Sequence, residues 1–167
     1  MTKYKDQRAG IFVDVANMYH SAKNLYKANV NFAKILETAI GNRQLIRAIA
    51  YVVRSKSKEE QSFFDAISKQ GFELKVKDLQ VFPGGMKKAD WDVGLAVDAI
   101  KMANKLDVIT LVTGDGDYIP LVNYLRENKG CLVELLGFKE TTSAKLIETV
   151  DVFTDLSKYK KRFLIKK

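Results

Sequence analysis

The chain has 167 residues, of which 47% are hydrophobic, and its 28 Lys and Arg residues against 20 Asp and Glu residues give a formal net charge of +8. This length and composition predict one globular domain that can build its own core. One cysteine, Cys131, excludes a disulfide framework and favours a reducing compartment, and one histidine, His20, excludes a multi-histidine metal centre. No apolar run approaches the roughly 20 residues that span a bilayer, and no signal-peptide core follows the first basic residues. We therefore expect a cytoplasmic protein with no membrane partner.

Apolar runs and helical patterns alternate along the chain. Strand patterns occur at residues 10–15, 45–53, 72–77, 108–112 and 131–136, and helical patterns at residues 31–40, 57–71, 92–103 and 119–128. The Ser57-Lys-Glu-Glu60 segment predicts a capping box at the start of the second of these helices. Strands separated by helix-length crossovers predict an α/β fold, with three α/β/α layers and a mainly parallel, Rossmann-like sheet of about five strands.

Positive charge is concentrated near the C-terminus. Residues 158–167 carry six basic residues and no acidic one. We expect a single domain over residues 1–157, followed by a basic C-terminal tail over residues 158–167. Basic ends often bind phosphate backbones, although a solvated tail that only aids solubility is an equally good explanation. The candidate phosphate contacts in the tail are Lys158, Lys160, Lys161 and Arg162.

Four acidic residues are expected at the carboxyl edge of the sheet, where ligands of such folds bind. Asp14 ends the first strand, Asp92 opens a helix, and Asp115 and Asp117 follow the strand at residues 108–112. Converging carboxylates repel one another unless a cation lies among them, and oxygen ligands without His or Cys select Mg²⁺ or Mn²⁺. Each acid taken alone is equally well explained as a helix cap or a partner of a helix dipole.

Other acidic and glycine-rich motifs fit the sequence less well. The turn after the first strand lacks the Gly-x-Gly-x-x-Gly pattern, and no Gly-Lys-Ser/Thr motif is present, so no nucleotide cofactor is expected. An EF-hand that starts at Asp115 would place Pro120 and Arg126 at positions that require Gly and Glu. The run Gly114-Asp-Gly-Asp117 resembles the last acidic motif of haloacid-dehalogenase-type phosphatases, but Ala16 stands where their nucleophile motif requires a second acid.

Several short motifs follow one another along the chain: Phe12-Val-Asp14-Val-Ala-Asn17, Lys88 with Asp92-Val-Gly-Leu-Ala-Val-Asp98, Thr113-Gly-Asp115-Gly-Asp117-Tyr118, Val133-Glu-Leu-Leu-Gly-Phe138, and Ser143. Together they resemble the NYN domain, in its LabA-like (DUF88) branch of the PIN-like ribonuclease superfamily. The resemblance implies a PIN-like α/β/α fold and a divalent-metal ribonuclease site. It matches Asp14, Asp92, Asp115 and Asp117 to the acidic cluster of the family, Asn17 to a polar residue beside it, and Asp98 to a further acid.

The chemistry that this resemblance implies is hydrolysis of RNA phosphodiesters, with single strands as the expected substrate, assisted by one or two Mg²⁺ or Mn²⁺ ions. Lys87 and Lys88 are candidates for holding substrate phosphates, and Tyr118 and Trp91 for stacking on unpaired bases, although a solvated loop and buried rings are plain alternatives. Two other functions remain open. One is a non-catalytic RNA-binding or regulatory module of the same fold, and the other is a small-molecule phosphatase.

Overall fold

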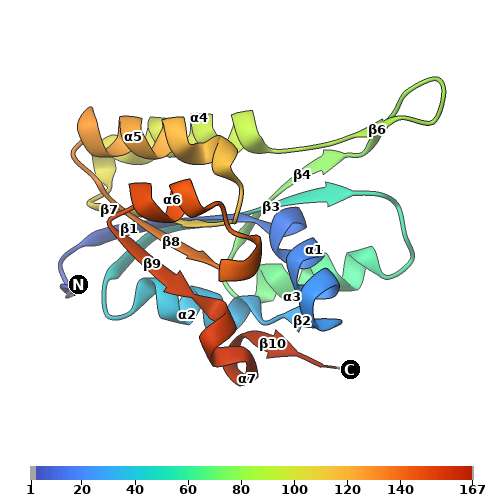
Figure 1. Ribbon diagram of the computed structural model, residues 1–167, viewed down its shortest axis with the longest axis horizontal. Coiled ribbons are helices and arrows are strands. Elements are labelled where there is room, and N and C mark those ends of the chain that lie inside the picture. Colours follow the sequence, from blue (N-terminus) through green and yellow to red (C-terminus); the bar gives the residue numbers. More distant parts are fainter. Residues whose placement is uncertain (1–2, 167) are drawn as a thin grey trace.

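A six-stranded sheet, in which every neighbouring pair of strands is parallel, forms the centre of the protein (Figure 1). The computed structural model describes residues 3–166 without the side chains of Lys87 and Lys88, so the predicted phosphate contacts of these two lysines lie outside the described residues. The strands are ordered β4-β3-β1-β7-β8-β9. Their bounds are β1 Arg8–Asp14, β3 Gln44–Arg54, β4 Glu73–Asp78, β7 Val108–Val112, β8 Leu132–Gly137 and β9 Val152–Asp155. The predicted α/β class and parallel sheet are confirmed, with one strand more than expected.

The additional strand is β9, at one edge of the sheet. It has only four residues, all half-buried, and pairs on one side with β8. A strand this short at an edge carries neither a continuous apolar run nor a clear alternation, so its sequence pattern is weak.

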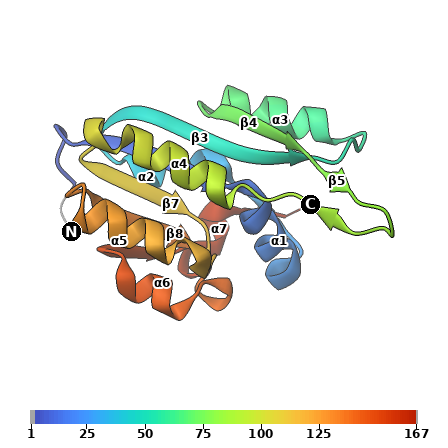
Figure 2. The same ribbon diagram turned by 90° about the horizontal axis from the view of Figure 1, so that it is seen from above.

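Helices cover both faces of the sheet and give the three predicted layers (Figures 1 and 2). One face carries α1 (Val15–Tyr26), α2 (Phe32–Ile40) and α3 (Glu60–Lys69), and the other carries α4 (Asp92–Met102), α5 (Ile119–Glu127) and α6 (Ala144–Thr149). Strand side chains alternate between the two resulting cores, with Ile11 and Val13 on the α2 side and Phe12 on the α4 side. Within residues 3–166, no helix is both long enough and apolar enough to cross a bilayer.

Two successive helices connect β1 to β3. α1 starts directly after β1 and ends at Lys27, whose backbone is left-handed (φ 53°, ψ 38°). The short strand β2 (Asn29–Val30) follows, and α2 then begins after Asn31, whose side chain accepts a hydrogen bond from the Lys34 N–H (3.2 Å). The buried side chains of α2 recur at the helical spacing expected from the sequence and pack on the sheet.

The loop between β3 and α3 does not contain the predicted capping box. α3 begins at Glu60 rather than after Ser57, and no side chain caps its first turn. The Glu60 carboxylate instead accepts the N–H groups of Ser55 (2.8 Å) and Lys56 (2.9 Å). These bonds fold the loop back on the helix start and leave Lys56 with a positive φ of 65°.

A hairpin projects from the sheet between β4 and α4 (Figure 2). Its strands are β5 (Gln80–Val81) and β6 (Lys87–Lys88), which pair antiparallel. The turn contains Gly84 (φ 94°) and Gly85 (φ 87°), in backbone conformations that a side chain would strain. The hairpin returns the chain to the start of α4 and so determines where Asp92 enters the fold.

The C-terminal segment is folded onto the domain. Residues after β9 form η4 (Leu156–Tyr159), α7 (Lys160–Phe163) and β10 (Leu164–Ile165), and β10 pairs antiparallel with β2. Phe163 and Leu164 are 2% and 8% exposed. The basic C-terminal tail that we expect over residues 158–167 is thus folded onto the domain as far as residue 165, because these two apolar side chains join the core on the α2 side. Three shorter 3-10 turns complete the fold: η1 (Ala103–Lys105), η2 (Gly116–Tyr118) and η3 (Lys139–Thr141).

A buried ion pair joins α2 to the sheet. Arg43, just after α2, donates from Nη2 to Oε2 of Glu134 (2.7 Å) and from Nη1 to Oε1 (3.0 Å). The two side chains are 0% and 5% exposed. Glu134 lies in β8 between Thr110 of β7 and Val152 of β9, so its charge sits inside the sheet layer and depends on Arg43 for compensation.

We expect Arg43→Ala to lower the free energy of unfolding by about 3–5 kcal/mol, because it leaves the Glu134 carboxylate buried and unpaired. The paired change Arg43→Met with Glu134→Leu should recover most of this loss, since neither charge then remains. Urea unfolding of the three proteins measures both effects. A single variant that loses less than about 1 kcal/mol would contradict the buried ion pair.

Candidate metal centre

Three of the four predicted acids meet at the carboxyl end of the sheet, where β1 and β7 lie side by side. Asp14 is the last residue of β1, Asp115 lies three residues beyond β7, and Asp92 is the first residue of α4. The register pairs Val13 with Val112, so the ends of the two strands are level. One carboxylate oxygen from each of the three acids lies within 4.8 Å of the others. We call Asp14, Asp92 and Asp115 the acidic trio, and its oxygen donors could hold a metal ion.

Asp14 is held in place from two sides. Its Oδ1 accepts the N–H of Asn17 (3.3 Å), which caps α1, and its Oδ2 accepts the Thr113 hydroxyl (3.3 Å). The Thr113 oxygen also accepts the Asp115 N–H (3.2 Å), so one threonine connects two acids of the trio. Burial raises the pKa of Asp14, and the charges of Asp115 and Asp90 add to this rise, while the two hydrogen bonds oppose it. Asp14 is thus both a helix cap and a member of the trio.

Asp92 is held by a buried tyrosine. The hydroxyl of Tyr118 donates to Asp92 Oδ1 (3.1 Å), and the Tyr118 side chain is 1% exposed. Burial raises the pKa of Asp92 to about 6, the charges of Asp115 and Asp14 contribute, and the Tyr118 hydrogen bond works in the opposite direction. A base-stacking role for Tyr118 is therefore wrong, because its ring is packed in the core beneath the site.

Asp117 stays outside the trio. It is exposed in η2, and its N–H donates to Asp115 Oδ1 (2.9 Å). The turn that carries both acids depends on Gly114, where an added Cβ would lie 2.5 Å from the Thr141 carbonyl oxygen. The glycine is needed here because the backbone of the next loop passes so close.

Asn17 connects α1 to the turn after β7. Its Oδ1 accepts the Gly114 N–H (2.9 Å), so it positions the backbone that leads to Asp115.

Asp98 stabilises the packing of α4 on the sheet. It accepts hydrogen bonds from the Lys75 ammonium (2.6 Å) and the Tyr51 hydroxyl (2.8 Å), which tie α4 to β4 and β3. Burial acts to raise the pKa of Asp98, but these two partners hold it below its usual value.

Asp90 was not predicted and lies beside the trio. Its Oδ1 accepts the Asp92 N–H (3.1 Å), and its charge raises the pKa of Asp14 and Asp92. The sequence signal was its place two residues before Asp92. Trp91, between them, donates from Nε1 to the Val52 carbonyl (2.9 Å) and packs under Lys77, whose ammonium is 4.5 Å from the ring. Trp91 therefore anchors the returning end of the hairpin.

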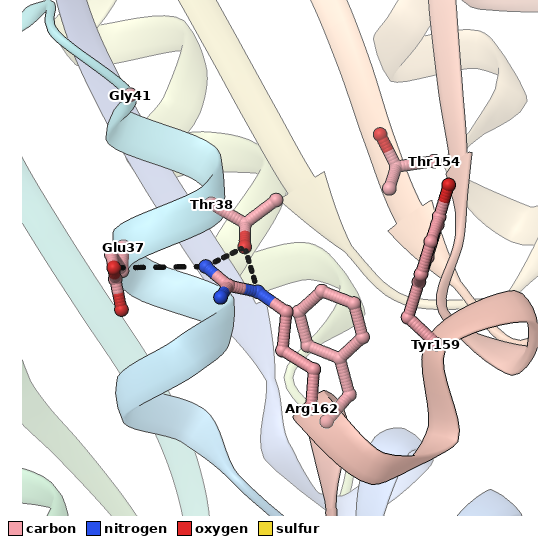
Figure 3. Close-up of a pocket in the computed structure, with 7 residues that line it drawn as sticks. Glu37, Thr38, Gly41, Thr154, Tyr159 and Arg162 are labelled. Atoms are coloured by element: carbon pink, nitrogen blue, oxygen red, sulfur yellow. Dashed lines mark hydrogen bonds and ion pairs between the residues drawn. The ribbon is translucent and has the colours of Figure 1, made fainter.

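The basic residues of the C-terminal segment differ in what they contact. Lys158 and Lys161 are exposed, and the Lys160 ammonium lies 4.7 Å from the ring centre of Tyr26. Arg162 turns toward the C-terminal end of α2, where it contacts the Thr38 hydroxyl (3.3 Å) and Glu37 (3.7 Å) (Figure 3). A cavity of about 480 Å³ at this place is lined by Glu37, Thr38, Gly41, Thr154, Tyr159, Arg162 and Phe163. It includes no member of the acidic trio.

The sequence model of the NYN domain matches residues 8–157. The chain belongs to the NYN domain family. NYN domains are part of a nuclease superfamily, which agrees with the place of the acidic trio in this fold and suggests a hydrolase.

The chain is also similar to two other proteins. The low amplitude and bright protein LabA of Synechococcus elongatus is 23% identical over 164 residues, which cover 92% of this chain and 86% of LabA. The crystal structure of a protein of unknown function from Vibrio parahaemolyticus superposes on this NYN domain with a TM-score of 0.88 and 30% identity. That alignment covers 99% of this chain and 100% of the other.

Repulsion within the trio has a consequence for stability. In metal-free protein at pH 7, we expect Asp92→Asn to raise the free energy of unfolding by up to about 1 kcal/mol, or about 2–4 °C in Tm, after allowance for solvent screening. The pKa of Asp92 is about 6 in the folded state and about 3.9 when unfolded, so the wild type loses this stability as the pH rises from about 4 to about 6. Thermal unfolding with EDTA at pH 4 and pH 7 measures the effect. An equal gain at both values would rule out a charge origin.

Proposed function

We propose that this NYN domain is a divalent-metal-dependent ribonuclease that hydrolyses phosphodiester bonds of single-stranded RNA. The observation that carries the proposal is the acidic trio, three carboxylates from separate elements within 4.8 Å at the carboxyl edge of a parallel sheet. Membership of a family within a nuclease superfamily supports it. Like charges gathered in this way destabilise a protein unless a cation lies among them. Such clusters occur mainly where function requires them.

The residues of the site fit Mg²⁺ or Mn²⁺. The donors are carboxylate oxygens, with neither His nor Cys among them, and they remain partly open to solvent at Asp92 and Asp115. A bound ion would polarise the phosphoryl group and lower the pKa of the attacking water. In this proposal Asp14, Asp92 and Asp115 hold the metal, and Asp117 lies at the rim as an outer acid.

The surrounding side chains keep the ligands in position. Thr113 and Asn17 fix Asp14 and the turn that carries Asp115, while Tyr118 fixes the carboxylate of Asp92. Such hydrogen bonds to ligands set their orientation and their affinity for metal. Asp98 is assigned to the structure of α4 rather than to catalysis, because Lys75 and Tyr51 occupy its carboxylate.

The two alternative functions are separable from this one. A phosphatase of the haloacid-dehalogenase type would need an acid in place of Ala16, two residues after Asp14. A non-catalytic RNA-binding module would keep the fold and the basic residues but would not need the carboxylates of the trio. Metal binding and cleavage therefore distinguish the proposals.

A bound divalent ion should stabilise the protein. At a metal concentration one hundred times Kd, the expected gain is about 2.7 kcal/mol, or about 5–10 °C in Tm. We expect Mn²⁺ to raise the Tm of the wild type, and Asp14→Asn to remove that shift because a ligand is lost. Thermal unfolding with and without Mn²⁺ measures it. The same shift in Asp14→Asn would place any bound metal elsewhere.

Cleavage should depend on the same carboxylates. With labelled single-stranded RNA and Mn²⁺, we expect Asp115→Asn and Asp14→Asn to lower the cleavage rate about 100-fold or more, because the charge that develops in the transition state loses its stabilisation. Asp117→Asn should have a smaller effect. Glu127→Gln, at the exposed end of α5, is the matched control and should cleave at the wild-type rate.

The wild type must also cleave above the level of the Asp115→Asn variant on several RNA sequences. Wild-type protein that binds these RNAs but shows no such Mn²⁺-dependent excess would refute the ribonuclease and favour the binding module.

A further inference from the structure

The outer side of α1 is basic and aromatic, and it starts at the acidic trio. α1 begins directly after Asp14, and its twelve residues include no acid. Tyr19, His20, Lys23 and Lys27 follow one another at spacings of one, three and four residues, which places them along one side of the helix. Tyr19 is 41% exposed, and His20 and Lys27 are exposed as well. We call these four residues, together with Lys56 of the loop before α3, the helix whose Phe63 ring lies 6.4 Å from Tyr19, the α1 surface.

Two lysines of the α1 surface have unfavourable backbone conformations. Among the described residues, the non-glycine residues with positive φ are Lys27 (53°) and Lys56 (65°). A side chain in this region costs about 1–2 kcal/mol, and glycine is the usual residue at such a helix end. Within residues 3–166, neither lysine side chain forms a hydrogen bond or an ion pair that offsets the cost. Their backbone N–H groups hold these conformations, from Lys27 to the Lys23 carbonyl (3.1 Å) and from Lys56 to the Glu60 carboxylate (2.9 Å), and leave both side chains available for binding.

The Tyr19 ring is held in a fixed position by its neighbours. The Lys23 ammonium is 5.7 Å from its centre, the His20 ring meets it edge-on at 5.4 Å, and the Phe63 ring of α3 lies 6.4 Å away. A half-exposed ring that is already ordered loses little entropy when another ring stacks on it. Unpaired bases stack on such rings, and the adjacent lysines suit the phosphates between bases.

We propose that the α1 surface is the track along which a single RNA strand extends from the acidic trio, with Tyr19 as its stacking platform and Lys23, Lys27 and Lys56 as its phosphate contacts. The assignment takes from the proposed function only that the ligand is RNA. α1 is about 18 Å long, which corresponds to about five nucleotides at the spacing of a stacked strand. At the far end of α1, Lys160 of α7 lies over the Tyr26 ring, but the Tyr26 hydroxyl donates to the Glu140 carboxylate (2.9 Å), so the α1 surface ends at Lys27.

The strained lysines allow binding to be separated from folding. Lys27→Gly and Lys56→Gly each remove a charge and also relieve the backbone, so Tm should stay the same or rise. Binding of a fluorescein-labelled 12-nucleotide oligouridylate should nevertheless weaken. The salt dependence, log Kd against log[salt], should flatten by about 0.7 for each lysine removed. Lys105→Ala, an exposed lysine in η1 at the opposite edge of the sheet, is the matched control and should leave the slope unchanged.

The aromatic contact has its own pair of variants. Tyr19→Ala should weaken binding at least about fivefold, whereas Tyr19→Phe keeps the ring and should bind within about twofold of the wild type. All binding is measured by fluorescence anisotropy in EDTA, so that neither metal nor cleavage contributes. Circular dichroism and Tm establish that each variant is folded.

The outcome separates this inference from the proposed ribonuclease. Loss of affinity and of salt slope in the glycine variants, with Tm preserved, supports the track whether or not the wild type cleaves RNA. A double variant Lys27→Gly, Lys56→Gly that binds with the affinity and slope of the wild type would overturn it, even if Mn²⁺-dependent cleavage is found. So would a wild type that does not bind the oligonucleotide.

Discussion

The order of the strands reverses between β1 and β7, and the place of every candidate metal ligand depends on this reversal. From β1 the chain crosses to β3 over one face of the sheet, and from β7 it crosses to β8 over the other. The connections therefore separate at the carboxyl ends of two adjacent strands, which is where open parallel sheets bind ligands. Asp14 ends one of these strands and Asp115 follows the other, while α4, which returns from the β4 side, brings Asp92 between them.

Three carboxylates gathered at this point lower the stability of the folded protein, and other parts of the structure have to offset this loss. Burial and mutual repulsion raise the pKa of Asp14 and Asp92, and hydrogen bonds from Thr113 and Tyr118 limit the rise. The fold compensates elsewhere, through two closely packed hydrophobic cores. The acidic trio thus lowers the stability of an otherwise stable fold. This is common at functional sites, where charged groups are kept for function although they do not stabilise the folded state.

Chain order and apolar periodicity were enough to predict the sheet and the edge at which the acids lie. Asp14 and Asp115 follow buried strands, and in a parallel sheet such positions converge. The same reasoning could not predict that Asp117, two residues after Asp115, lies outside the trio, because its exposure depends on how η2 folds. Asp98 follows Asp92 by six residues, which places it on another side of α4, and the structure gives it Lys75 and Tyr51 as partners.

Other features depended on tertiary packing that no local pattern contains. A tyrosine beside an acidic turn can be a stacking surface or a buried anchor, and only the packing of Tyr118 under Asp92 decides between them. The C-terminal segment has six basic residues, so its composition gave little weight to the apolar pair Phe163 and Leu164. Burial of this pair holds the segment against the domain, where β10 pairs with β2. Asp90 lies in no motif of its own, and only its place two residues before Asp92 indicates that it lies beside the trio.

Anomalous diffraction from crystals soaked in Mn²⁺ near pH 7 tests most directly the proposal that the acidic trio binds a metal ion. We predict an anomalous peak bound by Asp14, Asp92 and Asp115, and no peak at this position in crystals of Asp14→Asn. Wild-type crystals without a peak at the trio in millimolar Mn²⁺, or a peak that persists there unchanged in Asp14→Asn, would contradict it.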